Sequence, residues 1–315
     1  MSKKVMVWGS YVADLTGKAP HLPRAGETVF GNWFKTGPGG KGSNQAVAAH
    51  RAGADVMLVT KLGKDTFGDH ALDFYHENNI STDLILLDED YDTGIALICV
   101  DENTGQNQIL VVPGACTNFT AKDIETLRPK IVASDILLVQ LEINLDALER
   151  VVKIGKQAGG MIVLNPAPAR KISEELLSMV DIITPNEVEA EVLTGVSVFD
   201  EKSAQKAAEI LHANQVKTVV ITMGKSGVFV SDGKKSKMVE ARIVEAMDTT
   251  GAGDAFNGGF VTALAEGKDV FEAADFGNAL ASLSVQKFGT APSMPFRQEI
   301  DNLFVPEMGN NQREV

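Results

Sequence analysis

Short apolar runs alternate along the chain with longer alanine-rich or amphipathic stretches. The short runs predict buried strands, and they lie at residues 5–9, 56–60, 136–141, 161–164, 182–184 and 219–222. The longer stretches between them predict helices, at residues 42–52, 69–78, 145–158, 187–194 and 203–213. Strand–helix alternation of this kind predicts an α/β fold, with a mainly parallel central sheet and helices on both faces.

Two regions break this alternation. Residues 28–36 and 94–112 have β character and turns but no helix between them, so they predict a small sheet outside the main layers. We expect this sheet to be a lid, formed by segments at roughly 11–36 and 92–113 of a single domain that spans 1–305. Residues 252–286 are predicted to be helical, and the polar tail 306–315 is expected to be loose.

Composition narrows the functional classes. A chain of 315 residues, 44% hydrophobic and 23% charged, suits one large globular α/β domain. Its formal net charge of −13 repels nucleic acid and anionic membranes, so neither is an expected partner, but local helix ends can still hold phosphate. Cys99 and Cys116 lack the spacing of a disulfide or metal motif, which is typical of reduced cysteines. The sequence shows no signal-peptide pattern and no apolar stretch of about 18 residues that would predict a membrane span. These features predict a cytoplasmic protein.

The first glycine cluster, residues 37–44, lies between a β segment and a helix. Gly37, Gly39 and Gly42 match the spacing of dinucleotide-binding loops, but the first predicted strand ended far upstream, which disfavours NAD. The nucleotide-binding P-loop spacing also fails, because Val219 stands where Gly224-Lys225-Ser226 would need a glycine. The open alternatives are a loop that lets its backbone approach a ligand, and a glycine-rich turn without one.

The second glycine cluster, residues 248–256, opens a predicted helix. The backbone amides of Gly251, Ala252 and Gly253 can point together at an anion, helped by the helix dipole. Asp254 follows directly, and a carboxylate there can accept a proton from an attacking hydroxyl. The alternative is that Asp254 only caps the helix, and the adjacent glycines favour the catalytic interpretation.

Together the clusters at residues 39–45 and 248–259 resemble the two signatures of the ribokinase-like (PfkB) carbohydrate kinases. The similarity extends over nearly the whole chain. Further segments resemble the ribokinases and deoxyribokinases of that family, at 26–28, 140–142, 165–169 and 184–189. The resemblance implies a three-layer α/β/α sandwich with a small β-sheet lid, and a homodimer formed through the lid.

The same resemblance implies a catalytic site for phosphoryl transfer. Asp254 would be the base for the primary hydroxyl of a sugar, and Gly251, Ala252 and Gly253 would form the anion hole. Phosphoryl transfer requires mainly positioning and charge stabilisation, so no covalent nucleophile is needed. The sugar site would comprise Val12, Asp14, Gly40, Lys41, Asn44, Glu142 and Asp254.

The cofactors implied are ATP, Mg²⁺ and K⁺. ATP would contact Asn186, Thr222, Gly224, Lys225, Ser226, Gly227, Gly253 and Asn278. Asn186 and Glu189 would order Mg²⁺ through water, although helix capping after Pro185 is the alternative role for this pair. The monovalent-cation loop would comprise Asp248, Thr250, Ser284, Lys287, Gly289 and Ser293, mostly through backbone carbonyls.

One position departs from the family pattern. Val12 stands where ribokinases typically have an asparagine that touches a sugar hydroxyl, and deoxyribokinases have an apolar residue there. An apolar side chain cannot satisfy that hydroxyl, which predicts a pentose kinase for which 2-deoxyribose rivals or exceeds ribose. The alternatives are a family kinase for a hexose such as fructose or for a purine nucleoside, and a sugar-binding regulator without catalysis. The intact Asp254 cluster argues against the regulator.

Overall fold

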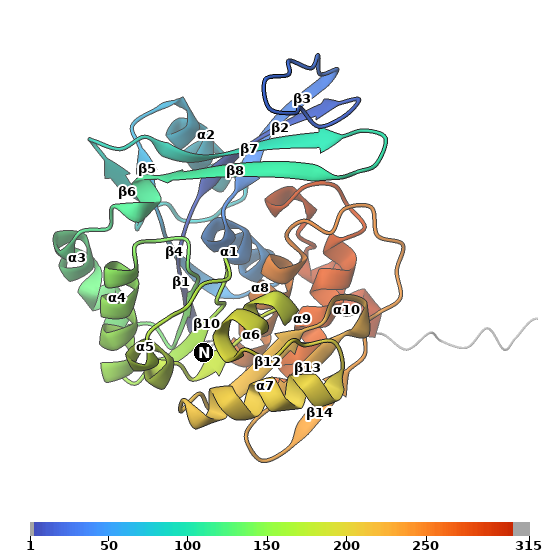
Figure 1. The fold of residues 1–315 in the computed structure, drawn as a ribbon. Coiled ribbons are helices and arrows are strands. Elements are labelled where there is room, and N and C mark those ends of the chain that lie inside the picture. The colour runs from blue at the N-terminus through green and yellow to red at the C-terminus, as the bar shows by residue number, and fades with distance from the viewer. Residues whose placement is uncertain (1–2, 305–315) are drawn as a thin grey trace, which may run out of the picture.

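The computed structural model describes residues 3–304, so the tail expected at 306–315 lies outside the described residues. Its main element is an eight-stranded sheet in the order β14-β13-β12-β11-β10-β9-β1-β4 (Figure 1). Within this sheet, β12, β11, β10, β9, β1 and β4 are all parallel to one another. β13 pairs antiparallel with both of its neighbours, β12 and β14. The strand bounds are β1 Lys4–Trp8, β4 Asp55–Val59, β9 Ile136–Val139, β10 Met161–Leu164, β11 Ile182–Ile183, β12 Thr218–Thr222, β13 Val228–Ser231 and β14 Ser236–Val239.

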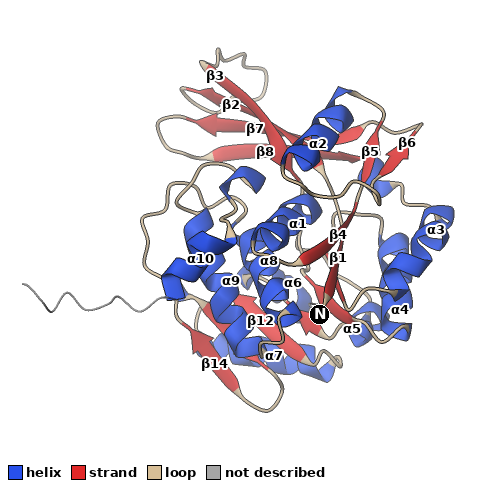
Figure 2. Cartoon of the chain, turned by 180° about the vertical axis from the view of Figure 1, so that it is seen from behind, coloured by secondary structure: helices blue, strands red, loops and turns tan. Residues whose placement is uncertain are grey.

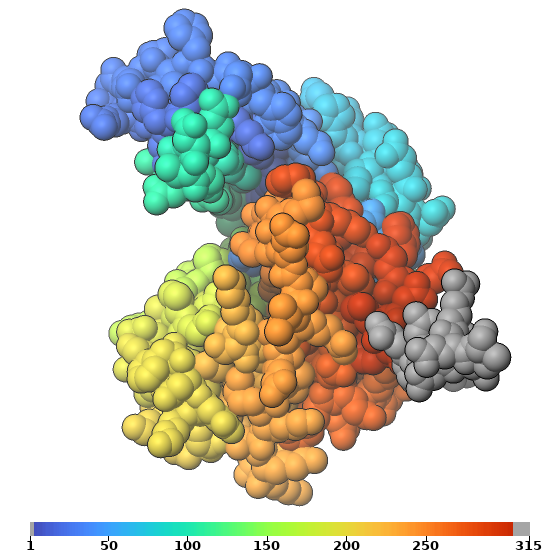
Figure 3. All heavy atoms as spheres, turned by 90° about the vertical axis from the view of Figure 1, so that its right-hand side faces the viewer, coloured from blue at the N-terminus to red at the C-terminus, as the bar shows by residue number. Residues whose placement is uncertain are grey.

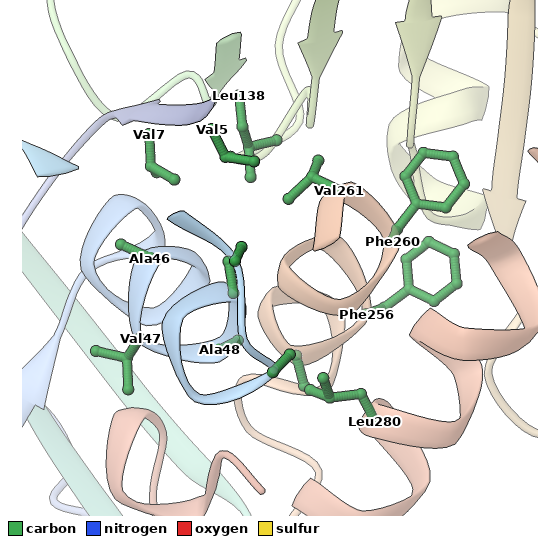
Figure 4. Packing of buried hydrophobic residues seen from close by; sticks show 14 of the residues in the cluster. Val5, Val7, Ala46, Val47, Ala48, Leu138, Phe256, Phe260, Val261 and Leu280 are labelled. Carbon is green, nitrogen blue, oxygen red and sulfur yellow. The ribbon is translucent and has the colours of Figure 1, made fainter. Parts of the chain in front are cut away.

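Helices cover both faces of this sheet, which confirms the predicted layers. Val5 and Val7 of β1 face one core, built with α1 Lys41–Arg51, α2 Thr66–Glu77, α8 Ala252–Ala265, α9 Val270–Ser284 and α10 Arg297–Phe304 (Figure 4). Met6 and Trp8 face the other core, built with α3 Ala121–Val132, α4 Leu145–Gln157, α5 Glu174–Met179, α6 Glu187–Thr194 and α7 Glu201–Ala213. The side chains alternate because successive residues of a strand point to opposite faces.

A separate four-stranded sheet lies above the carboxyl ends of the main strands (Figures 1 and 2). Its order is β3-β2-β7-β8, with β2 parallel to β7 and the other pairs antiparallel. The bounds are β2 Val12–Ala19, β3 Trp33–Gly39, β7 Thr93–Asp101 and β8 Asn107–Gly114, and a small pair, β5 Lys61–Gly63 and β6 Leu86–Asp88, lies nearby. The small sheet predicted from the sequence is therefore present.

Local differences from the sequence prediction have identifiable causes. Residues 28–32 are a loop rather than a strand, because this segment belongs to the turn between β2 and β3 that contains Gly26 at φ 81°. The stretch 252–286 is two helices, since Gly267 adopts φ 90° and Asp269 caps a new helix. The hairpin β13–β14 and helix α3 were not predicted. Within residues 3–304 no helix is long and apolar enough to cross a membrane.

Candidate active site

The first glycine cluster allows helix α1 to pack against the end of β1. A Cβ on Gly42 would lie 2.5 Å from the backbone carbon of Gly9, and one on Gly9 would lie 2.0 Å from Oε1 of Gln140. Gly40, which precedes the helix, adopts φ 86°. These positions therefore require glycine, and their close approach brings the first turn of α1 to the carboxyl ends of β1 and β9.

Asp254 lies in the first turn of α8, directly opposite that turn of α1. Its Oδ2 accepts a 2.9 Å hydrogen bond from Nδ2 of Asn44, and its Oδ1 accepts one of 2.9 Å from Nε2 of Gln45. Burial raises the pKa of Asp254, while the positive charge of Lys41 and both hydrogen bonds oppose that rise. The carboxylate is thus oriented by amide donors and held close to a cation.

A network of buried polar side chains extends from Asp254. Gln45 accepts a hydrogen bond from Gln140 and donates one to Asn165, whose amide donates to the carbonyl of Thr184. The Thr184 hydroxyl donates to Asn257, and Asn257 donates to the carbonyl of Gly253. The sequence analysis did not assign these side chains to the site. Gln45 and Asn165 lie inside the segments that carried the family resemblance, which is the signal that identifies them.

A cavity of about 170 Å³ opens beside Asp254. The residues that line it come from the carboxyl ends of the main strands and from the second glycine cluster: Lys41, Asn165, Ala167, Thr184, Asn186, Glu189, Thr222, Thr249, Gly251, Ala252, Gly253, Asp254 and Asn257. The expected anion hole, the expected base and the expected Mg²⁺ pair therefore share one cavity. Gly251 is the N-cap residue of α8, so the N-terminus of this helix lies at the cavity; there the amide of Ala252 donates to the carbonyl of Thr249 at 3.2 Å.

Asn186 and Glu189 form a capping box at the start of α6. The Asn186 side chain accepts from the amide of Glu189 at 2.8 Å, and Oε2 of Glu189 accepts from the amide of Asn186 at 2.9 Å. Burial raises the pKa of Glu189, against the Asn186 hydrogen bond and the charge of Lys41. Within residues 3–304 no group of three or more His, Cys, Asp or Glu side chains could hold a metal alone. One buried carboxylate suits an ion that keeps most of its waters, as Mg²⁺ does.

A second cavity, about 660 Å³, lies between the small sheet and the loops 247–250 and 288–292 (Figure 3). Asp14 lines it, and burial raises the pKa of Asp14 to about 7, with the nearby carboxylates of Glu142 and Asp254 adding to the rise. Glu142 accepts a 3.0 Å hydrogen bond from the backbone amide of Lys41.

Two further residues of the predicted sugar site lie beside these acids. The buried Oδ1 of Asn44 has no hydrogen-bond partner among residues 3–304, so it is available to accept from a ligand hydroxyl. Val12 is buried in β2 and pairs in register with Gly39 of β3, beside Gly40. Its side chain can supply no hydrogen bond to such a ligand.

The predicted nucleotide loop follows β12. The residues from Gly224 to Ser226 form a single 3-10 turn, and Thr222 bridges to Asn186, which places the loop next to the first cavity. Gly227 adopts φ 95° and packs against Glu240, whose carbonyl also accepts a 2.7 Å hydrogen bond from Asn278. The structure therefore brings the predicted ATP residues near the carboxyl end of β12, with Lys225 on the turn.

The predicted monovalent-cation residues occupy two adjacent loops. Asp248 accepts hydrogen bonds from the amides of Thr250 and Gly289, and so joins the two loops. Ser284 and Ser293 are buried beside them. The side chain of Lys287 points elsewhere, to an ion pair with Glu299 at 2.6 Å, so only its backbone carbonyl is free for the expected role.

Comparison with known proteins identifies the family. The profile of the pfkB family carbohydrate kinases matches residues 2–297. The chain belongs to this family. It is 45% identical over 299 residues to the ribokinase of Haemophilus influenzae, covering 95% of this chain and 97% of that protein. It is 34% identical over 292 residues to the deoxyribokinase of Salmonella typhi, covering 92% of this chain and 95% of that protein.

A solved structure shows the same fold. Arabidopsis thaliana ribokinase complexed with ribose and ATP superposes with a TM-score of 0.88 at 32% identity, covering 96% of this chain and 99% of the other. This pfkB family member is therefore a sugar kinase of the ribokinase group, a phosphotransferase with an alcohol group as acceptor. This assignment replaces the NAD-binding interpretation of the first glycine cluster and the non-catalytic regulator, both considered from the sequence.

Proposed function

We propose that the protein transfers the γ-phosphate of ATP to the primary (5-) hydroxyl of a pentose, ribose or 2-deoxyribose. The observation that carries this proposal is the position of Asp254, buried in the first turn of α8 beside Gly251, Ala252 and Gly253 in the same cavity. The relatives named ribokinase and deoxyribokinase, and the Arabidopsis structure with ribose and ATP, support the choice of substrates.

In the proposed reaction Asp254 accepts the proton of the attacking sugar hydroxyl. Asn44 and Gln45 hold its two carboxylate oxygens in place. The amides of residues 251–253 stabilise the negative charge on the phosphoryl group in transfer, since these residues form the N-terminus of α8 and line the cavity. Burial by itself would lower the pKa of Lys41, but Asp254, Glu142 and Glu189 hold it above its usual range, so Lys41 stays charged beside the transferred group.

The metal and nucleotide sites complete the proposal. Glu189 and Asn186 would hold Mg²⁺ through its waters, and the ion would supply charge neutralisation for the phosphates of ATP. Thr222, Gly224–Gly227 and Asn278 would surround the nucleotide. K⁺ would bind to carbonyls of the loops joined by Asp248, and the activity would then fall when K⁺ is replaced by tetramethylammonium.

The small sheet is proposed to act as the lid of the sugar site and as the dimer interface. On its edge strand β8, Ile109, Leu110, Val111 and Val112 are each about half exposed, so both faces of this edge are apolar. An apolar edge strand that faces water is a surface for pairing with another chain. Light scattering should give the dimer mass for the wild type, and Leu110→Glu should shift it towards the monomer.

Two measurements test the proposed function. ATP consumption is measured with ribose, 2-deoxyribose, fructose and purine nucleosides, and the proposal requires the pentoses to have the highest kcat/KM. Asp254→Asn should lower kcat by about 10²–10⁴-fold while ATP still binds. The matched control is Asp73→Asn, on the exposed face of α2, which should leave kcat unchanged. Full activity of Asp254→Asn would remove this residue from the role of base.

A further inference from the structure

We propose that Thr290 is a positioning residue that couples the lid, the sugar-binding carboxylate Asp14 and the anion hole at Gly251. The role rests on the proposed function, because it assumes that Asp14 receives sugar hydroxyls. Neither the sequence pattern nor the expected cation loop assigned a function to Thr290. Its hydroxyl and its methyl group are inferred to act on different steps.

The hydroxyl of Thr290 faces the small sheet. Its Oγ1 lies 2.9 Å from the carbonyl oxygen of Pro38 in β3, and 3.4 Å from Oδ2 of Asp14 in β2. A threonine hydroxyl carries one proton, so it donates mainly to the nearer Pro38 carbonyl and can shift to the carboxylate. This single group therefore links the loop after α9 to the two lid strands that border the sugar site.

The hydrogen bond also acts on the charge of Asp14. Burial raises the pKa of Asp14 to about 7, the Thr290 hydroxyl opposes that rise, and Glu142 and Asp254 add to it. A donor that favours the ionised carboxylate keeps it ready to accept from sugar hydroxyls. Removing the donor is therefore expected to weaken sugar binding.

The methyl side of Thr290 faces Gly251 of the anion hole. A Cβ built on Gly251 would lie 3.4 Å from Cα of Thr290, and 3.5 Å from its Cβ and Cγ2. Gly251 adopts φ 79° as the N-cap residue of α8, so its conformation sets the direction of the amides that follow it. The Thr290 side chain thus bounds the space beside Gly251, and we infer that its methyl group restricts the movement of this turn.

The backbone around Thr290 is held firmly enough for this role. Its carbonyl accepts from the amide of Ser293 at 3.0 Å and from the Ser293 hydroxyl at 2.7 Å. Arg51 of α1 donates to the carbonyls of Ala291, Pro292 and Met294. Thr290 is itself buried, so its side chain has a fixed set of neighbours.

The test separates the hydroxyl from the methyl group. Thr290→Val keeps the shape and loses the hydroxyl, and we expect it to raise the sugar KM about tenfold while the ATP KM and kcat change less than about twofold. Thr290→Ser keeps the hydroxyl and loses the methyl group, and we expect a sugar KM close to that of the wild type with a severalfold lower kcat. The sugar is whichever substrate the wild-type enzyme phosphorylates, so the test does not depend on the choice of pentose.

Two further comparisons keep the proposal falsifiable. If Thr290→Val does not fold, the sugar KM of Thr290→Ser is compared with that of Thr290→Ala. These two variants differ only in the hydroxyl group. In an Asp14→Asn background Thr290→Val should add little to the sugar KM, because the two residues act together. Equal sugar KM values for the serine and valine variants would overturn the proposal. That result is distinct from failure of the proposed function, which the substrate panel and Asp254→Asn decide.

Discussion

Nε2 of Gln45 donates a 2.9 Å hydrogen bond to Oδ1 of Asp254, although the two residues are 209 positions apart in the chain. The bond joins the first turn of α1 to the first turn of α8. The same amide group donates to Asn165 at 3.0 Å, and Oε1 of Gln45 accepts from Gln140. One buried side chain therefore connects both glycine clusters to the strand ends and holds the proposed base in position.

The first prediction concerns this connection. Gln45→Met keeps the approximate length of the side chain but removes its side-chain hydrogen bonds, which leaves Oδ1 of Asn165 and Nε2 of Gln140 without a partner. We expect kcat to fall about 10–100-fold, and the free energy of unfolding to fall by about 1–3 kcal/mol. Steady-state kinetics and urea unfolding measure the two effects. Gln157→Met, at the exposed end of α4, is the control and should change neither.

The second prediction concerns pH. Because the pKa of Asp14 is raised to about 7 in the folded protein, its contribution to stability is fully present below its unfolded pKa and is lost as pH rises through 7. Asp14→Asn should therefore raise the free energy of unfolding at pH 8, by about 1 kcal/mol or more, and have little effect near pH 4. Unfolding curves at both pH values measure the difference.

The same Asp14→Asn substitution that is expected to increase stability should decrease activity. Asp14→Asn is expected to raise the sugar KM strongly above pH 7, where the wild-type side chain is ionised, because an amide cannot accept two hydroxyl protons in the same way as a carboxylate. A variant that gained no stability at pH 8 would contradict the buried charge at Asp14. Asp83→Asn, in an exposed loop, serves as the control for both measurements.

The third prediction concerns the choice of sugar. Val12 is buried beside Gly39, so a polar group of similar size placed there would face the sugar site. Val12→Asn should shift the ratio of kcat/KM values towards ribose, relative to 2-deoxyribose, by about tenfold, which corresponds to about 1.4 kcal/mol. Val12→Ala loses packing but gains no hydrogen bond, and it should leave the ratio unchanged. Equal ratios for the asparagine and alanine variants would show that this position does not select the sugar.

The fourth prediction concerns the metal. Glu189→Gln removes the charge but preserves the capping box, because glutamine at this position can also accept from the Asn186 amide. The Mg²⁺ concentration needed for half-maximal activity should rise about tenfold, with the melting temperature within a few degrees of the wild type. Glu191→Gln, exposed on the same helix, is the matched control. An unchanged Mg²⁺ requirement would leave Glu189 with capping as its sole role.

Local signals in the sequence predicted much of the fold and proposed the centre of the candidate site. The alternation of apolar runs and helical stretches predicted the main sheet. The spacing of apolar residues in a helix or a strand is set by the local backbone geometry, so it can be recognised in the sequence. The two glycine clusters identified Asp254 and its neighbours, since a loop that must approach another backbone or an anion requires glycine at particular positions. The strand β2 lies within the lid segment expected at 11–36, but its bounds were not predicted because most of its residues are half-buried and mixed in polarity.

The sequence alone determined the family, the layered architecture and the identity of the proposed base, through motifs whose members are close together in the chain. Only the tertiary structure decided which distant residues support that base. Gln45, Asn165 and Thr290 reach the site from separate elements, and the hydrogen bonds and contacts that define them exist only after the strand ends and loops have come together. Contacts of such long range leave no periodic signal in one sequence, because their geometry depends on how the layers pack.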